Sequence, residues 1–216
     1  MKKIFNVILL ALFCTSFAQA QVGKTFEFTY KGQTLKYEVA NGNEAMVSKQ
    51  QSERISGDVK IPESVTFEGK KYRVTTIGKY AFASCKGLTS VTIPNSVTTI
   101  GEEAFKYCKG LTSVTIPNSV TTIGEAAFAY CKGLTRVSLP NSVTTIGGFA
   151  FAYCKGLTSI TIPNSVTKIG GYAFYDCTSL TSVTIPNSVT EIGKCAFADC
   201  ENLKSINVAK DNSHYC

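Results

Sequence analysis

The sequence predicts an α/β repeat solenoid, in which units of 23 residues are stacked behind an N-terminal β cap. Three observations lead to this prediction. The string Leu-Thr-Ser-Val-Thr-Ile-Pro-Asn-Ser-Val-Thr-Thr-Ile-Gly begins at Leu88 and returns, unchanged or nearly so, four more times at intervals of 23 residues. Phe, Cys and Gly occupy the same place in every copy. Both ends depart from the pattern, as the terminal units of a solenoid must.

Residues 1–20 predict a secretory signal that is removed from the folded protein. A basic start precedes the apolar run from Ile4 to Phe13, and Ala18-Gln19-Ala20 supplies the small residues that signal peptidase recognises. A membrane anchor is the alternative, but the run is too short to span a bilayer, and no other segment is long enough. We therefore expect a protein that is exported and then secreted or kept at the cell surface.

Residues 21–58 carry no 23-residue repeat and predict a β-hairpin that caps the first coil. Alternating residues predict strands over 25–30 and 34–39, joined around Gly32. A turn is expected at Asn41-Gly42-Asn43, which follows the second strand.

The solenoid itself is predicted over residues 59–208, as six repeats and a partial seventh. The first repeat holds an insertion of nine residues between Pro62 and Ile77. Within it, Phe67-Glu68-Gly69-Lys70 predicts a small hairpin.

Each repeat begins with a predicted strand, which the copy from Leu111 illustrates. Leu111, Val114 and Ile116 follow the spacing L-x-x-L-x-L, and the last two alternate as residues of a strand do. Pro117 lacks a backbone donor and ends the strand.

The rest of the repeat predicts a second extended piece and a short helix. Val120 and Ile123 should point inward, and Gly124 should reverse the chain with a positive φ. In residues 125–131 the apolar positions have near-helical spacing, which predicts one to two helical turns.

Stacking places identical residues above one another, about 4.8 Å apart, so that each column becomes an interior ladder. The phenylalanine ladder should contribute most, because each ring removes roughly 150–250 Å² from water. It consists of Phe82, Phe105, Phe128, Phe151, Phe174 and Phe197.

Six of the nine cysteines form a second ladder. Disulfides are one possibility in an exported chain, but the side chains of one column point the same way, which is poor disulfide geometry. We expect buried, reduced thiols. The ladder consists of Cys85, Cys108, Cys131, Cys154, Cys177 and Cys200.

The C-terminal end is predicted to be open. Residues 203–208 begin a seventh strand, and residues 209–216 form a tail without an evident cap. An open strand edge favours pairing with another chain. We therefore consider a longer array, a truncated gene product and self-association through this edge or through Cys216.

The columns resemble the BspA-type leucine-rich repeats of surface proteins from Bacteroides-like bacteria. The resemblance covers about residues 57–208, and its motif reads Ile-Pro-Asn-Ser-Val-Thr-Thr-Ile-Gly-Glu-Ala-Ala-Phe over residues 116–128. It implies a right-handed leucine-rich-repeat superhelix at the cell surface or in the medium. It also implies binding to host matrix proteins, host receptors or other bacteria, without catalytic residues.

Composition and motifs argue against several function classes. After residue 20 the chain has 20 basic and 15 acidic residues, which gives a net charge of +5. This mild excess falls short of the dense cluster of basic residues that a nucleic-acid-binding protein carries. A single His, no Trp and no catalytic or phosphate-binding motif argue against an enzyme or a cofactor. Zinc at Cys177, Cys195, Cys200 and His214 would lack the paired C-x₂₋₄-C spacing. We expect no metal.

Three surfaces are candidates for binding an extracellular protein or glycan, and each has a simpler interpretation as ordinary solvated surface. The predicted strand face carries Ser90, Thr92, Ser113, Thr115, Arg136, Ser138, Ser159, Thr161, Ser182 and Thr184. A basic ridge for acidic polymers is formed by Lys86, Lys109, Lys132 and Lys155. A third column, which could instead pack over the phenylalanine ladder, consists of Tyr107, Tyr130 and Tyr153.

Two function hypotheses follow. The favoured one is a non-enzymatic adhesion or recognition protein at the cell surface or in the medium. The alternative is a structural module that assembles with itself or forms part of a larger surface protein.

Overall fold

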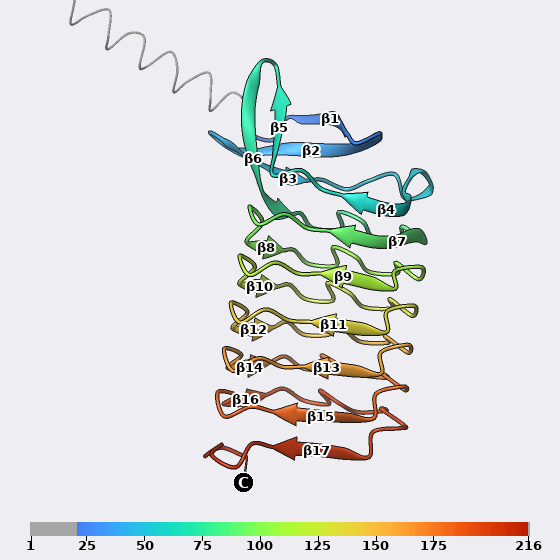
Figure 1. The fold of residues 1–216 in the computed structure, drawn as a ribbon, viewed down its shortest axis with the longest axis vertical. Coiled ribbons are helices and arrows are strands. Elements are labelled where there is room, and N and C mark those ends of the chain that lie inside the picture. Colours follow the sequence, from blue (N-terminus) through green and yellow to red (C-terminus); the bar gives the residue numbers. More distant parts are fainter. Residues whose placement is uncertain (1–20, 216) are drawn as a thin grey trace, which may run out of the picture.

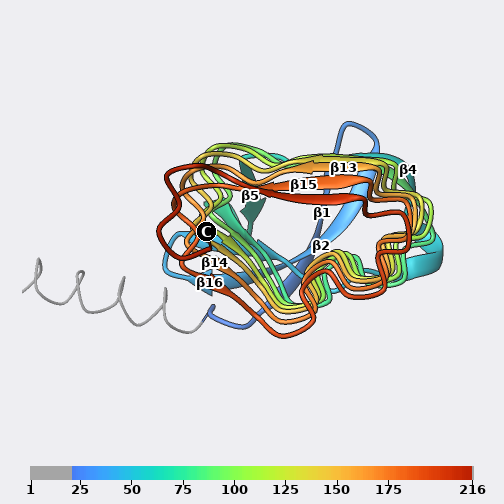
Figure 2. The same cartoon turned by 90° about the horizontal axis from the view of Figure 1, so that it is seen from below.

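The structure is a computed structural model that describes residues 21–215, so the predicted signal peptide and Cys216 lie outside the described residues. The chain forms a β-solenoid of about six stacked coils, each of about 23 residues (Figure 1). Seen along the stack, the coils lie over one another with nearly the same outline (Figure 2).

One side of the stack is built from the main strand of each coil. The strands are parallel, and a residue in one coil pairs with the residue 23 positions later, as Val91 does with Val114. The sheet β4-β7-β9-β11-β13 is continued by the separate pair β15-β17. The bounds are β4 Ser56–Lys60, β7 Gly87–Thr92, β9 Ser113–Thr115, β11 Arg136–Ser138, β13 Ser159–Thr161, β15 Ser182–Ile185 and β17 Ser205–Val208.

A second side is built from strands of two residues each. They extend a sheet that begins with the N-terminal strands and runs β1-β2-β3-β6-β8-β10-β12-β14-β16. Ile123 pairs with Ile100 in one neighbouring coil and with Ile146 in the other. The bounds are β8 Thr99–Ile100, β10 Thr122–Ile123, β12 Thr145–Ile146, β14 Lys168–Ile169 and β16 Glu191–Ile192.

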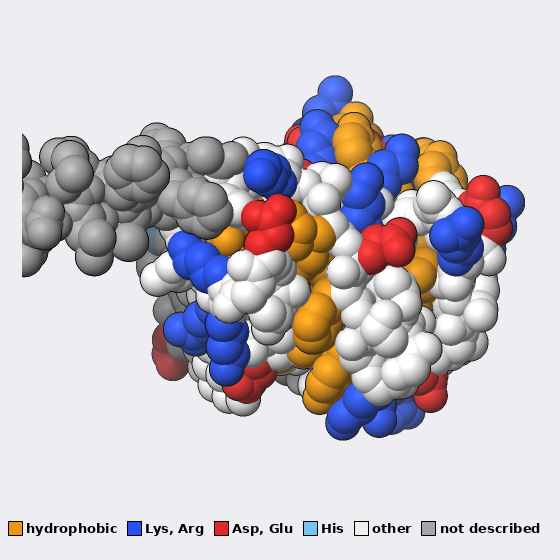
Figure 3. Space-filling model, turned by 90° about the horizontal axis from the view of Figure 1, so that it is seen from above, with side chains coloured by type: hydrophobic (Ala, Val, Ile, Leu, Met, Phe, Trp, Pro, Cys, Tyr) orange, Lys and Arg blue, Asp and Glu red, His pale blue; other side chains and the backbone are white. Residues whose placement is uncertain are grey.

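The strands predicted near the N-terminus are confirmed. β1 (Thr25–Tyr30), β2 (Gln33–Asn41) and β3 (Glu44–Val47) form an antiparallel meander, and β3 then pairs in parallel with β6 (Lys70–Ile77). Seen from this end, a band of hydrophobic side chains runs between charged ones (Figure 3).

The hairpin predicted inside the first repeat is also confirmed. β5 (Ser64–Phe67) pairs antiparallel with β6, and the hairpin rises above the first coil (Figure 1). Its two loop residues, Glu68 and Gly69, have φ values of 48° and 76°. Two successive positive φ values are the mark of a type I′ turn, which suits the twist of a two-residue hairpin.

The short helix predicted in each repeat is wrong. Within the described residues the one helical element is the 3₁₀ turn η1 (Ser52–Arg54), and the third side of each coil is a run of tight turns. The N–H of Ala127 donates to the carbonyl of Gly124 three residues back, at 3.3 Å. The next amide, that of Phe128, donates to Ala150 of the following coil at 2.8 Å. An α-helix would bond every amide four residues back, whereas these turns share their amides with the neighbouring coil.

Positive φ values also break the expected helix twice per coil. In the third coil Ala126 has a φ of 51° and Tyr130 a φ of 62°. Both occupy the third position of a turn, where a type II turn needs a positive φ. Two such turns in succession bring Ala127, Phe128 and Cys131 to the inside of the coil. Their spacing along the sequence is close to that of one face of a helix, which is why the sequence predicts a helix there.

The positive φ predicted for Gly124 is wrong as well, because the positive-φ glycines of the described chain are Gly23, Gly32, Gly57 and Gly69. A Cβ atom on Gly124 would instead lie 2.7 Å from the backbone nitrogen of Glu102, in the preceding coil. The column is therefore glycine because two backbones meet there, with no room for a side chain.

The interior consists of residue ladders. Five of the six ladder phenylalanines are fully buried and Phe197 is half-buried. Neighbouring rings lie 5.1–5.5 Å apart between centroids and within 7° of parallel. The ladder cysteines are buried and carry free thiols. Each Sγ from the second coil on donates to a phenylalanine carbonyl of the preceding coil, as Cys131 does to Phe105 at 3.1 Å.

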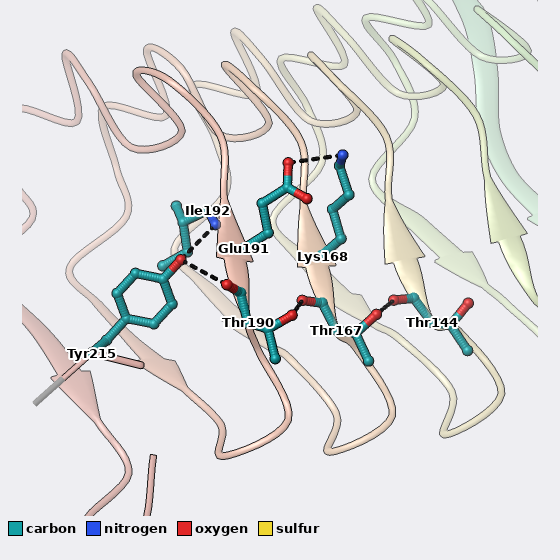
Figure 4. Close-up of polar contacts among 7 residues, drawn as sticks. All are labelled: Thr144, Thr167, Lys168, Thr190, Glu191, Ile192 and Tyr215. Carbon is teal, nitrogen blue, oxygen red and sulfur yellow. Dashed lines mark hydrogen bonds and ion pairs between the residues drawn. The ribbon is translucent and has the colours of Figure 1, made fainter. Parts of the chain in front are cut away.

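Hydroxyl side chains join the coils along two further columns. Ser119 donates to the carbonyl of Val97 in the preceding coil at 2.5 Å, and the serines 23, 46 and 69 residues later repeat this bond. Thr167 and Thr190 each donate to the carbonyl of the threonine 23 residues earlier, both at 3.3 Å (Figure 4). Many of the exposed hydroxyl residues are thus part of the stacking.

Residues 209–215, where we expected a tail, continue the register of the preceding coil. Asn212 stands 23 residues after the buried Val189 and is itself 1% exposed. Its side-chain amide donates to the carbonyls of Pro186 at 2.8 Å and Val189 at 3.2 Å. A polar side chain therefore takes the place of an apolar one in the last coil.

A tyrosine hydroxyl covers part of the last strand edge. The hydroxyl of Tyr215 accepts from the backbone N–H of Ile192 at 2.8 Å and lies 3.4 Å from the carbonyl of Thr190, to which it donates (Figure 4). Both backbone groups point away from β14, where a further strand would pair with them. The outer edge of β17 keeps exposed apolar residues, Ile206 at 49% and Val208 at 38%.

Candidate binding surface

The predicted strand-face residues lie on the outer side of the first sheet. Of the ten residues named for this face, Ser90 is half-buried and the other nine are exposed, among them Ser113, Thr115, Arg136, Ser138, Ser159 and Thr161. Within residues 21–215 their side chains form no hydrogen bond or ion pair with other described residues. The exception on this side is at its start, where Ser90 donates to Asp58 at 2.6 Å. This side therefore presents an array of hydroxyl groups and one positively charged side chain, that of Arg136.

The lysine column lies where the turns lead back to the main strand. Lys86, Lys109, Lys132 and Lys155 are all exposed. Lys155 forms an ion pair with Asp176 at 2.9 Å, and that hydrogen-bonded carboxylate raises the pKa of the lysine. The other three have no ion-pair partner among residues 21–215, so they form a short row of unpaired cations.

The tyrosine column lies on the third side of the coils, the side built from turns. Tyr107 and Tyr130 have centroids 4.5 Å apart, and Tyr130 and Tyr153 have centroids 4.2 Å apart. No ring contact with the phenylalanine ladder occurs within the described residues. The three rings stack on one another outside the core, and Tyr107 is 37% exposed.

Three aromatic residues that the sequence analysis did not single out extend this column. Tyr153 meets Tyr175 edge-on at 5.3 Å, and Tyr175 meets Tyr172 at 5.6 Å. Tyr172 in turn stacks on Phe149 at 4.8 Å, within 5° of parallel. We call the six connected rings the aromatic patch: Tyr107, Tyr130, Tyr153, Tyr175, Tyr172 and Phe149.

The patch shares its turns with small buried residues, and two of its rings are exposed to solvent. Ala126, Ala129 and Ala152 are almost completely buried on the same turns. Phe149 and Tyr107 are each 37% exposed, and they are two of the five large hydrophobic residues that are exposed in the described chain.

Charges surround the patch unevenly. Lys109, Lys132 and Lys155 follow the three tyrosines two residues later along the chain, and acidic residues gather in the last two coils. A hydrogen bond with Asp199 raises the pKa of Tyr175 to about 12. Burial and hydrogen bonding with Tyr153 raise the pKa of Tyr130 to about 12. The hydroxyls of Tyr130 and Tyr175 therefore stay protonated at neutral pH.

The repeats differ from one another mainly on the side that bears the patch. The strand-turn-strand string from Leu88 is kept almost unchanged, including its exposed Thr and Asn residues. The position two residues after the glycine column differs in every copy except for a repeated tyrosine: Tyr80, Glu103, Ala126, Phe149, Tyr172 and Cys195. This difference between copies is the signal in the sequence that could have revealed the missing rings.

Three further properties of the described part of the chain concern metal-ligand groups, membrane-spanning helices and thiol reactivity. Among residues 21–215 no three His, Cys, Asp or Glu side chains are grouped to hold a metal ion, and the four residues considered for zinc form no such group. No helix there has the length and hydropathy to cross a bilayer. Burial raises the pKa of Cys85 and Cys154 to about 12, so these thiols are poor nucleophiles.

Comparison with known proteins gives one family and several similar structures. The model of the BspA type leucine rich repeat region matches residues 62–177 and 144–215, with six copies. No curated protein matches the chain.

Solved structures of bacterial leucine-rich repeat proteins are similar over most of the chain. A leucine rich cell surface protein from Faecalibacterium prausnitzii A2-165 is 32% identical with a TM-score of 0.64, covering 87% of this chain and 55% of that one. This chain thus spans little more than half the length of that protein. A T. pallidum leucine rich repeat protein is 29% identical with a TM-score of 0.73, covering 80% and 78%. The pneumococcal vaccine antigen PcpA is 23% identical with a TM-score of 0.67, covering 89% and 51%, and shows the shared fold.

Proposed function

Because this chain belongs to the BspA-type leucine-rich repeat family, we propose that it is a non-enzymatic binding protein, secreted or held at the cell surface. We further propose that the aromatic patch is the centre of its contact with an extracellular protein. The similar protein from F. prausnitzii is described as a cell surface protein, which supports the location.

The single observation that carries the proposal is the run of six touching rings outside the core. Tyrosine is favoured at interfaces because its ring is apolar and its hydroxyl is polar. Rings already packed on one another lose little side-chain freedom when a partner binds, so less of the binding energy is lost in ordering them.

Ring orientation favours a protein over a glycan as the partner of the patch. Tyr107, Tyr130 and Tyr153 face one another at 4.2–4.5 Å, so most ring faces are already covered. The surface therefore offers ring edges and hydroxyls, which suit backbone groups and apolar side chains of a protein. The patch covers four coils, roughly 14 Å at about 4.8 Å per coil, which is the size of the centre of an interface rather than of a whole one.

The test is binding of the purified protein to an array of host matrix proteins and mucins. Tyr130→Ser combined with Tyr153→Ser should lower affinity at least tenfold, as expected for central aromatic residues. Ser138→Ala combined with Ser159→Ala is the control on the strand face and should leave binding unchanged. Equal loss in both double variants, from protein with unchanged circular dichroism, would contradict the patch as the contact.

Salt dependence separates the patch from the lysine row. A contact made by Lys109, Lys132 and Lys155 should weaken steeply as ionic strength rises, because exposed charges are screened within about 8 Å at physiological salt. A contact made mainly by aromatic rings should keep most of its affinity. Steep salt dependence together with normal binding by the tyrosine variant would indicate that the lysine row, and not the aromatic patch, makes the contact.

The C-terminal end favours a second candidate function, self-assembly. β17 has an unpaired outer edge within the described residues, and it carries the exposed Ile206 and Val208. Such an edge is a template for pairing with another chain. Sedimentation over a range of concentrations tests this candidate, since Ile206→Lys should abolish any concentration-dependent association.

We also propose that the N-terminal strands act as the cap of the stack. Phe26, Leu35 and Val39 from β1 and β2 are buried above the first coil. Their apolar side chains give the first coil a partner that a further repeat would otherwise supply.

A further inference from the structure

We propose that the first repeat contains a second binding site, distinct from the aromatic patch, for a sugar that carries a carboxylate. The site is an open pocket of about 510 Å³, where the inserted hairpin meets the first coil. This volume lies within the roughly 300–1,000 Å³ that is typical of small-ligand pockets. The lining residues are Asn43, Glu63, Ser64, Lys71, Arg73, Asn95 and Ser96.

Three separate parts of the chain build this pocket, which makes it unique in a repetitive molecule. Lys71 and Arg73 lie on the outer face of β6, alternating with the buried Tyr72 and Val74. Ser64 pairs with Arg73 from β5, and Asn43 precedes β3. Glu63 directly precedes β5, and the turn after β7 supplies Asn95 and Ser96. Because the later repeats have no inserted hairpin, they cannot form a second copy of the pocket.

A buried serine in the wall lacks the partner that its equivalents have. In the next four coils the matching serines donate to a valine carbonyl of the preceding coil at 2.5–2.7 Å. Ser96 is 3% exposed, and its hydroxyl has no hydrogen-bond partner. If Ser96 followed the pattern of the serines in the later coils, it would donate to the carbonyl of Val74, which lies in β6 of the inserted hairpin. The Ser96 oxygen has almost no solvent-accessible area, so the missing bond marks where the wall departs from the repeat and does not offer a contact to a ligand.

The charges of the pocket select an anionic ligand. Lys71 and Arg73 are exposed and have no ion-pair partner within residues 21–215, against the single acid Glu63. Arginine binds a carboxylate with two parallel hydrogen bonds. The nearby Glu44 is not part of the pocket lining, and its carboxylate accepts from the side-chain amide of Asn41 at 2.6 Å.

The neutral groups of the pocket select a ligand rich in hydroxyls. Two asparagine amides and the hydroxyl of Ser64 offer both donors and acceptors, and Glu63 accepts hydrogen bonds. A sugar ring with one carboxylate combines the required charge with several hydroxyls. Uronic acids and sialic acids share this chemistry, so both are probes of the site.

The test is calorimetric titration of the purified protein with glucuronic acid, N-acetylneuraminic acid and glucose. We expect at least one of the two acidic sugars to bind at least tenfold more tightly than glucose, because the carboxylate adds charge-assisted hydrogen bonds. The acid that binds identifies the source. Equal binding of glucose, or no binding of either acid, would overturn the proposal.

Variants locate the site. Arg73→Gln should weaken binding of the acidic sugar about tenfold or more, whereas Arg136→Gln removes the same charge on the strand face and should have no effect. Ser96→Ala should leave folding intact, since its buried hydroxyl has no partner in the protein. Equal effects of the two arginine variants would refute the site.

The outcome is independent of the proposed function. The double tyrosine variant of the aromatic patch should bind the sugar normally, and Arg73→Gln should bind matrix proteins normally. Loss of sugar binding in the tyrosine variant would contradict the separation of the two sites.

Discussion

Removing the ring of Phe128 should destabilise the solenoid more than any single change at its surface. This ring is fully buried between Phe105, with centroids 5.1 Å apart, and Phe151, with centroids 5.3 Å apart. Replacing a buried phenylalanine with alanine costs about 3–5 kcal/mol, through lost burial and the cavity left behind. The two stacked contacts each contribute about 0.5–1.5 kcal/mol beyond burial, so we expect the upper part of that range for Phe128→Ala.

The ladder contains its own control at the last coil. Phe197 is half-buried and has a single ladder neighbour, Phe174, with centroids 5.2 Å apart. Phe197→Ala loses one ring contact instead of two and leaves a cavity that water can enter. The free energy of unfolding should therefore fall by only about 1–2 kcal/mol.

Urea unfolding followed by circular dichroism measures both changes. The chain has no Trp and ten Tyr, so tyrosine fluorescence gives a second probe. Repeat arrays can unfold in parts, and agreement of the two probes is needed before a single free energy is assigned. If Phe128→Ala and Phe197→Ala unfold at the same urea concentration as the original protein, the stacking of these rings does not stabilise the fold.

Two other changes test the close contacts and the buried thiols. Gly147→Ala should cost about 1–3 kcal/mol or prevent folding, because its Cβ would lie 2.7–2.8 Å from backbone atoms of the preceding coil. Gly148→Ala is the neighbouring control, with its closest atom at 3.4 Å, and thermal melts of the two variants should differ clearly. Burial raises the pKa of Cys154 to about 12, above the roughly 8.5 of an unfolded thiol. Its contribution to stability is therefore complete below about pH 8.5 and is lost as the pH rises toward 12. Melts at pH 8 and pH 10 should show a larger loss in the original protein than in Cys154→Ala, and equal losses would refute this assignment.

The repeat length predicted the stack, its strands and its interior columns, because each of these depends on residues that recur every 23 positions. The third side of each coil was predicted as a helix for a physical reason. Apolar residues at positions 127, 128 and 131 fit a helical face and fit two successive turns equally well. The hydrogen bond from Phe128 to Ala150 of the next coil and the positive φ values of Ala126 and Tyr130 distinguish them. A bond between coils leaves no periodic trace within one repeat.

The aromatic patch was only partly predictable for a similar reason. Tyr107, Tyr130 and Tyr153 share one column, and a column is visible in the sequence. Phe149 and Tyr172 occupy a second column, four residues earlier in each coil, and Tyr175 occupies a third. The turn geometry brings these columns to one surface, with Tyr175 contacting both.

A uniform stack has difficulty forming a specific site, since every groove on it repeats in each coil about 4.8 Å further on. Specific recognition needs a place where this symmetry is broken. The chain breaks it twice. On the turn side the exposed residues change from coil to coil, while the interior Phe and Cys columns stay constant. The aromatic residues of the patch can therefore differ between coils without disturbing the packing of the core. In the first repeat the inserted hairpin leaves Ser96 without the carbonyl that its equivalents use. The ladders therefore provide a rigid frame, and binding should be found at these two departures from the repeat, rather than along its invariant strand face.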